Sequence, residues 1–242
     1  MSRTTDELAA RKSVRVFTEH EISNADKNLI LTSATMAPSA GNQQLYTVID
    51  VTDERIKRRL VDTCDGQPFI ASAKMVLVFL ADCKKWYDAF RFGGCEPRKP
   101  GVGDLMLAVT DAAIAAQNAV TAAESLGIGS CYIGDIMENY EEQRELLGLP
   151  EYVFPACMLV FGYPTEEQKA RLKPQRAALS HIVHENGYRE MDADELEDML
   201  AYKSAALPYR EWLARFCARK YDSDFSREMS RSVAEYIKQF ER

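Results

Sequence analysis

The sequence lacks several features that mark common classes of protein. It has only three histidines, and no two of its six cysteines have C-x-x-C spacing, so neither a zinc site nor a disulfide framework is indicated. His181 and His184 stand three residues apart, but no third metal ligand is evident, and we expect a surface pair. The net charge is −7, whereas a general nucleic-acid binder is usually basic. We therefore expect no metal and no nucleic acid.

Long apolar segments are also missing. The longest strongly apolar run, Met75–Ala81, is far too short to span a bilayer, so no membrane is expected. The first residues, MSRTTDELAARKS, are polar and lack the apolar core of a signal peptide. Together with cysteines that fit reduced thiols, this predicts a cytoplasmic protein. At 242 residues, of which 46% are hydrophobic, the chain is long enough to bury a sizeable core.

Helical and strand patterns mix along the chain without regular alternation. Helices are predicted over 4–13, 24–36, 53–64, 103–127 and 138–148, and strands over 45–51, 73–82, 128–134 and 153–164. The Ala-rich segment 103–127 is expected to be a central core helix, ended by Gly127. Residues 84–103, rich in Gly and Pro, are predicted as a long loop of the kind that often forms a lid. Because crossover helices do not alternate with strands, we predict the α+β class.

The C-terminal part has a different character. Asp192, with Glu195 three residues later, is an N-terminal helix signal, and charged helices then follow to the C-terminus. Breaks are expected near Pro208 and Asp222. A tail of this kind, with little strand signal, could wrap around a partner subunit.

Two basic segments suit an anionic ligand. If RKSVRVF is extended, Arg11, Ser13 and Arg15 face one way, and two guanidinium groups and a hydroxyl can hold a phosphate or another planar anion. A second cluster, QKARLKPQR, follows a predicted strand and contains Lys173 and Arg176. From the residues alone, solvated charged segments remain the alternative for both.

Two further segments bring polar groups to the ends of predicted elements. In PSAGNQQ, Ser39 and Asn42 offer side-chain hydrogen bonds, and Gly41 allows the backbone to approach a ligand closely. In YIGD, a strand that ends at Gly134 can direct backbone N–H groups into a cleft. An ordinary turn is the alternative for PSAGNQQ.

The order and spacing of these segments resemble the flavin-dependent nitroreductases, which bind FMN in an α+β homodimer. R-x-S-x-R is followed by APSAGNQQ and a strand; after the Ala-rich helix comes AAESLGIGSCYIGDI, and FGYPTE precedes a Lys/Arg loop. Gln67 in DGQPFIASA, together with LKPQR and HENGY, is similar to the subgroup of NADPH nitroreductases and flavin reductases. The likeness runs from about residue 5 to 190. It implies a central mixed or antiparallel sheet flanked by helices in an FMN-binding core (1–190), and a helical extension (191–242) packing on the core and the partner subunit.

The resemblance also implies a set of cofactor-binding residues. Arg11, Lys12 and Ser13 would lie near the phosphate and ribityl chain, and Lys173 and a following arginine would close on the phosphate. The subgroup reads K-P-R where this chain reads K-P-Q-R. PSAGNQQ would line the pocket across the dimer interface. The full implied set is Arg11, Lys12, Ser13, Arg15, Pro38, Ser39, Ala40, Asn42, Gln67, Tyr132, Ile133, Gly134, Asp135, Lys173 and Arg176.

The activity implied is that of an FMN-dependent NAD(P)H oxidoreductase. Hydride would pass from NADPH or NADH to flavin N5 and then, in ping-pong order, to nitroaromatics, quinones or flavins. The flavin carries this chemistry, so no other catalytic residue is implied beyond Arg15, which would tune it. Arg219 is implied at NADPH, with a solvated helix-end charge as the alternative. A homodimer with shared flavin sites is expected. The remaining alternatives are a flavin-delivering protein with little turnover and a domain without a cofactor.

Overall fold

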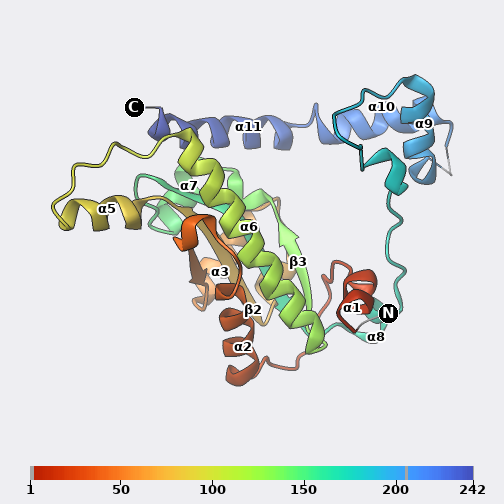
Figure 1. Ribbon diagram of the computed structural model, residues 1–242. Coiled ribbons are helices and arrows are strands. Elements are labelled where there is room, and N and C mark those ends of the chain that lie inside the picture. Colours follow the sequence, from red (N-terminus) through yellow and green to blue (C-terminus); the bar gives the residue numbers. More distant parts are fainter. Residues whose placement is uncertain (1–2, 205–206, 242) are drawn as a thin grey trace. The chain divides into compact units, whose positions relative to one another are not determined.

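The computed structural model describes residues 3–204 and 207–241, and the chain divides into two compact units (Figure 1). The core unit contains the residues up to Arg171 and from Glu228 onward, and it holds the sheet. The helical unit is Leu172–Arg227. The division into 1–190 and 191–242 concerns the family-like core and its extension, and it stays a prediction.

The core unit is built on a four-stranded sheet. In spatial order its strands are β1 (Tyr46–Asp50), β2 (Met75–Asp82), β4 (Val153–Gly162) and β3 (Gly129–Ile133). Every described pair of neighbouring strands is antiparallel. The four predicted strands and the α+β class are therefore confirmed.

Helices surround this sheet and make up the second unit. In the core unit they are α1 (Arg3–Ala10), α2 (Asn24–Thr35), α3 (Glu54–Thr63), α4 (Phe69–Ser72), α5 (Lys84–Phe92), α6 (Val102–Ser125), α7 (Tyr140–Leu146) and α8 (Glu166–Ala170). They are followed by α9 (Ala193–Leu200), α10 (Tyr209–Lys220) and α11 (Asp224–Ile237). Single 3-10 turns are η1 (Ala40–Asn42), η2 (Asp135–Met137), η3 (Leu179–His181), η4 (Ala201–Lys203) and η5 (Lys238–Phe240). The five predicted helices of the core are confirmed, although the first ends at Ala10.

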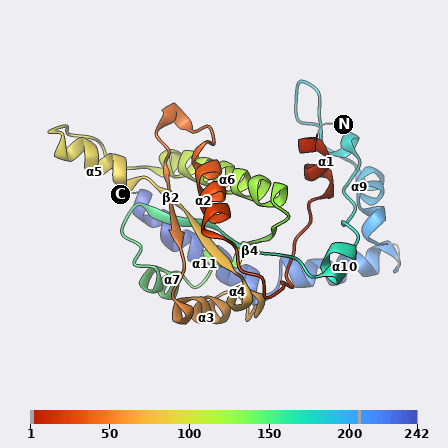
Figure 2. The same ribbon diagram turned by 90° about the horizontal axis from the view of Figure 1, so that it is seen from below.

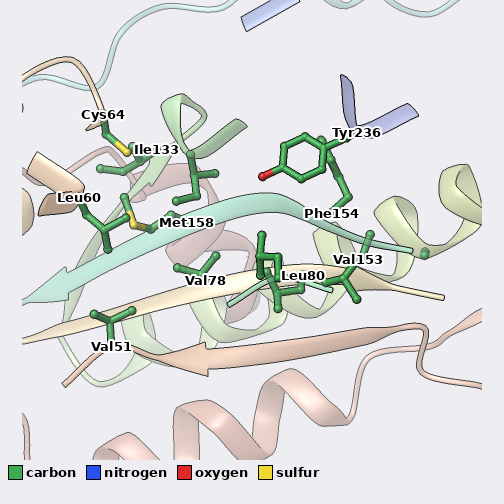
Figure 3. Close-up of a cluster of buried hydrophobic side chains, with 14 of the residues drawn as sticks. Val51, Leu60, Cys64, Val78, Leu80, Ile133, Val153, Phe154, Met158 and Tyr236 are labelled. Carbon is green, nitrogen blue, oxygen red and sulfur yellow. The ribbon is translucent and has the colours of Figure 1, made fainter. Parts of the chain in front are cut away.

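Side chains of β2 alternate between two apolar clusters. Leu77 and Phe79 belong to the cluster that α2 and α6 cover (Figure 2). Val78 and Leu80 belong to the other cluster, which α3 covers and Tyr236 of α11 closes (Figure 3). Since both faces of the sheet are covered, β2 is buried along its whole length and reads as one continuous apolar run.

The Ala-rich helix α6 is the core helix that the sequence predicted. It buries nine residues, six of them alanines, against β2, β4 and α2. Small side chains allow this close approach of helix and sheet. By length and composition alone, α6 is also the one helix in the described part of the chain that could cross a membrane, but much of its apolar surface is buried in the core.

The predicted loop over 84–103 is wrong in its first half. Residues 84–92 form α5, and only the stretch between α5 and α6 is irregular. The glycines and prolines of this region all lie from Gly93 onward, whereas KKWYDAFRF contains none. The Asp82 carboxylate accepts the backbone N–H groups of Lys84 and Lys85, which starts the helix. The basic cluster around Lys169 likewise begins in a helix, α8, where a loop was predicted.

Helices of the helical unit begin where the local signals predicted. Asp192 accepts the backbone N–H groups of Asp194 and Glu195, and the Glu195 carboxylate accepts the N–H of Asp192, which completes a capping box. α10 begins directly after Pro208, and α11 begins two residues after Asp222.

Candidate functional site

The segment that follows α1 is extended and lies along the sheet. Its backbone bridges Ser13 to Ser130 and Phe17 to Pro164, and the Val14 N–H donates to the Ser130 carbonyl at 3.0 Å. Two strand glycines make room for it. A Cβ at Gly129 would lie 2.5 Å from Val14, and one at Gly162 would lie 2.6 Å from Phe17, so any other residue would push the segment away. The extended conformation that the anion-binding interpretation of RKSVRVF assumed is observed, whereas the helix predicted to residue 13 ends at Ala10.

Arg11 is the most unusual side chain of this segment. Its guanidinium stands over the Tyr132 ring, 5.7 Å from the centroid, beside Gln117 and Thr121 of α6. Nε and Nη2 are buried, and neither has a hydrogen-bond partner among the described residues. Unpaired buried donors of a cation are costly, so these nitrogens favour an anionic or strongly polar partner. The cavity beside them holds only about 10 Å³ and is also lined by two acidic side chains, Glu7 and Glu124, so a larger ligand requires these side chains to move. Burial is the main cause that raises the pKa of the Tyr132 phenol, and Arg11 opposes it.

Lys12 and Arg15 have other neighbours. The Lys12 ammonium donates to the carbonyl oxygens of Lys169 and Arg171, the former at 2.6 Å, and so fastens the segment to the end of α8. The Arg15 guanidinium lies over the Phe69 ring at 5.8 Å, and its backbone N–H donates to the side chain of buried Gln168. Ser13 is exposed. The guanidinium groups of Arg11 and Arg15 therefore stand over different rings.

The loop PSAGNQQ forms a tight turn that α6 holds in place. Gly41 has a φ of 57°, and Asn42 and Gln44 share this left-handed backbone, which supports a close backbone approach. Asp111 of α6, only 3% exposed, accepts the N–H groups of Ala40 at 3.0 Å and Leu45 at 3.1 Å. One buried carboxylate thus anchors both ends of the loop.

One side chain of this loop forms a hydrogen bond within the loop, and others are exposed or half-buried. The Ser39 hydroxyl accepts the Gln44 N–H at 3.0 Å. Pro38 and Asn42 are exposed, and Ala40 is half-buried. Sequence reasoning missed Asp111, although a single acid in the middle of an apolar, Ala-rich helix was the signal for it.

Gln67 and the turn after β3 lie close to the same segment. The Gln67 amide donates to the Cys64 carbonyl at 2.9 Å, and two residues later Phe69 carries the Arg15 guanidinium. Gly134 and Asp135, both half-buried, lead from β3 into η2, whereas Ile133 is buried in the core. The structure therefore brings three predicted segments together: 11–15, 67–69 and 132–135.

The remaining predicted residues belong to the helical unit. Arg176 donates to the Pro174 carbonyl at 2.7 Å and, with Tyr202 and Lys203, lines a cavity of about 540 Å³. Arg219 lies over the Phe216 ring at 5.4 Å. Lys173 has a partner within the structure. The roles of Lys173, Arg176 and Arg219 stay predictions.

An aromatic cavity beside the PSAGNQQ loop was not predicted. It measures about 310 Å³ and is lined by Trp86, Tyr87 and Phe90 of α5 and by the Arg98–Asp104 ion pair. The Trp86 indole N–H donates to the Gln43 carbonyl at 2.7 Å, which joins α5 to the loop. Sequence reasoning missed the cavity because it did not predict α5.

The titratable side chains that the structure describes do not form an obvious metal centre. Among the residues that the structure describes, no group of three or more His, Cys, Asp or Glu side chains is arranged to hold a metal ion. His181 is paired with Asp198 at 3.3 Å, and the His184 ring accepts the Arg189 N–H.

Comparisons with known proteins agree with this arrangement. Residues 8–163 match the model of the nitroreductase family. The chain is 36% identical over 193 residues to the oxygen-insensitive NADPH nitroreductase of Salmonella typhimurium, covering 79% of this chain and 77% of that protein. It is 31% identical over 240 residues to an FMN reductase [NAD(P)H] of Bacillus subtilis, covering 98% and 91%.

Solved structures share the whole fold. NfrA2 of B. megaterium, 27% identical in sequence, superposes with a TM-score of 0.87 over 100% of both chains. The hypothetical oxidoreductase YcnD of Bacillus subtilis, also 27% identical, gives a TM-score of 0.83 over 98% of both chains. The family match spans more than half of the chain, and the resemblance seen in the motifs is confirmed: the protein belongs to the nitroreductase family.

Proposed function

We propose that this protein is an FMN-dependent NAD(P)H oxidoreductase. The observation that carries the proposal is Arg11, whose Nε and Nη2 are buried and have no hydrogen-bond partner among the described residues. Arg11 joins the 11–15 segment to Tyr132, and the family resemblance implies that both lie at the cofactor. The names of its relatives, an NADPH nitroreductase and an FMN reductase, support the same activity.

The residues of the core unit fit the parts of FMN. Arg11 and Ser13 would bind the phosphate and ribityl chain, since buried cationic donors pair strongly with anionic oxygens. Arg15 and Gln67, brought together through Phe69, would face the polar edge of the ring system, where a guanidinium stabilises negative charge. Backbone N–H groups at Gly134 and Asp135 would orient the ring. When bound, FMN would supply the redox chemistry, taking a hydride from NAD(P)H at N5 and delivering it to an acceptor in a separate step.

Acceptor and donor would use this one pocket in turn, which gives ping-pong kinetics. Nitroaromatics, quinones and flavins are the proposed acceptors. Lys173 and Arg176 would add positive charge at the phosphate, and Arg219 would bind NADPH.

A homodimer is part of the proposal. A single chain leaves several large apolar side chains exposed: Leu29 of α2, Met36 directly after α2, and Met106, Leu107 and Ile114 of α6. Exposed apolar surface of this kind marks a protein interface. The PSAGNQQ loop follows directly on α2 and is anchored to α6, so a partner docked here would lie next to it. The six cysteines are free thiols, which supports a cytoplasmic place.

Two measurements test the function. The purified protein should be yellow and show a flavin spectrum, and it should oxidise NADPH in the presence of a quinone with parallel lines in double-reciprocal plots. A flavin spectrum without turnover would favour the flavin-delivering protein instead. A colourless protein that does not take up FMN would refute the proposal.

A further inference from the structure

Glu138 is a buried acid directly behind the turn that carries Gly134 and Asp135. It follows η2, and its N–H donates to the Asp135 carbonyl at 3.0 Å. Glu138 is only 5% exposed, and its Oε1 has no hydrogen-bond partner among the described residues. A buried carboxylate oxygen left unpaired is unfavourable when it is charged.

The residue that follows Glu138 is held by hydrogen bonds to two other elements. Asn139, with a φ of 51°, donates its N–H to the Glu228 carboxylate at 3.2 Å and its side-chain amide to the Thr63 carbonyl at 2.9 Å. These bonds tie Glu138 to α11 and to the end of α3. The neighbouring turn, 64–67, is the one that carries Gln67.

Negative charge surrounds the Glu138 side chain. Asp135 on its own turn, Asp65 after α3 and Glu228 on α11 all act on it electrostatically, and its charge acts on the Cys64 thiol. Arg231 pairs with Glu228 at 2.7 Å and lowers the pKa of that carboxyl to about 2, so Glu228 stays ionised at neutral pH. Burial, followed by these carboxylates, raises the pKa of Glu138 to about 8.

We propose that Glu138 is a positioning residue that keeps the Gly134–Asp135 turn beside the Asp65–Gln67 turn. This role rests on the proposed function, because both turns are assigned there to the flavin. A neutral carboxyl lets the two turns stay together with Asp65 and Asp135 in place. Its ionisation would add a negative charge to those of Asp65, Asp135 and Glu228, and the repulsion would disturb the surfaces that contact the ring.

The sign of the pH effect follows from proton binding. Because the folded state keeps the Glu138 proton that the unfolded chain releases near pH 4.3, the folded state binds more protons between that pH and about 8. Stability assigned to Glu138 is therefore lost as the pH rises through this window. FMN affinity should fall near the upper end, as the carboxyl ionises in the folded protein.

The experiment compares the wild type with Glu138→Gln, whose amide has the shape of the protonated acid and cannot ionise. FMN binding is titrated by fluorescence quenching between about pH 6.5 and pH 9.5. Across this range we expect the wild-type affinity to weaken by about tenfold, the effect of one pKa unit, while Glu138→Gln stays nearly constant. Glu145→Gln, an exposed acid on α7, is the matched control and should behave like the wild type.

Two measurements that need no flavin accompany the titration. The infrared carbonyl band of a protonated carboxylic acid should be present at neutral pH in the wild type and missing in Glu138→Gln. The melting temperature of the wild type should fall, relative to Glu138→Gln, as the pH rises to about 9.

The outcomes separate the two proposals. Failure of the wild type to bind FMN at any pH would overturn the proposed function and, with it, this role. FMN binding with the same pH dependence in wild type and Glu138→Gln would overturn the role of Glu138 alone. The two proteins could also differ in the pH dependence of melting but not in that of FMN affinity. This result would overturn the role as well, since Glu138 would then be a buried acid that does not position the turns.

Discussion

The core unit and the helical unit form their helices and strands for different reasons. In the core unit, every residue of β2 is buried and α6 packs a row of alanines against the sheet. In the helical unit, α9 and α10 bury none of their described residues, and Leu179, Ile182 and Tyr188 are largely exposed. Apolar burial therefore specifies the first unit, whereas local signals such as the Asp192 capping box specify helix starts in the second.

Removal of one aromatic ring from each unit tests this difference and has the largest expected effect. Phe79 is fully buried in β2, so Phe79→Ala should lower the free energy of unfolding by about 3–5 kcal/mol. Tyr188→Ala, at a position 87% exposed, should change it by less than about 0.5 kcal/mol. Urea unfolding measures both. A comparable loss in the two variants would show that Tyr188 is covered in solution and would remove the contrast between the units.

Arg11→Ala tests whether the ligand site rests on the core unit. Two buried donors of this side chain have no partner in the part of the chain that the structure describes, and a hydrogen bond to a charged group contributes about 1.5–3 kcal/mol. FMN affinity should weaken by about that amount in equilibrium titrations. Arg55→Ala removes one positive charge from the exposed face of α3 and serves as the control. Unchanged FMN retention in Arg11→Ala would count decisively against a phosphate site there.

Asp111→Asn sharpens the comparison within the core unit, because it weakens a loop without opening a cavity. The amide can still accept one of the two N–H groups of Ala40 and Leu45 but leaves the other unpaired, at a cost of about 1–3 kcal/mol. Hydrogen exchange should speed up at these two amides and stay slow in β2. Equal acceleration in both places would mean that Asp111 supports the whole core and not the loop.

Asp111 also shows where sequence reasoning reached its limit. Strands were predicted because apolar runs need burial, whereas the extended conformation of residues 11–17 was only assumed as a condition for an anion site. A lone acid in an apolar helix marked Asp111, but the sequence did not show its partners, which lie 66 and 71 positions away. The buried acid Glu138 was missed for the same reason.

The glycines of the sequence indicated only some of the close backbone contacts. Gly41 was expected to allow a close backbone approach, and its positive φ agrees with this. Gly129 and Gly162 were not singled out. They are needed because the side chains of Val14 and Phe17 pack directly against them, and these contacts are made only in the folded chain. Residues 84–92 were predicted as loop because they were treated as one segment with residues 93–103, which contain all the glycines and prolines of this region. The motif order, in contrast, identified the family and the candidate site residues.

The smallest expected effect concerns Arg219 of the helical unit. It is an exposed side chain in the last turn of α10, held over the Phe216 ring, and an exposed charge interaction contributes about 0.2–1 kcal/mol. Arg219→Ala should therefore raise KM for NADPH by at most about fivefold and leave KM for NADH nearly unchanged, because only NADPH carries the 2′-phosphate. kcat should change less, since a contact remote from the reacting atoms is similar in ground and transition states. Arg215→Ala, one turn earlier and paired with Glu211, is the matched control. An equal loss with both nicotinamides would indicate a structural role for Arg219, and no loss with either would make it a helix-end charge that favours the dipole of α10.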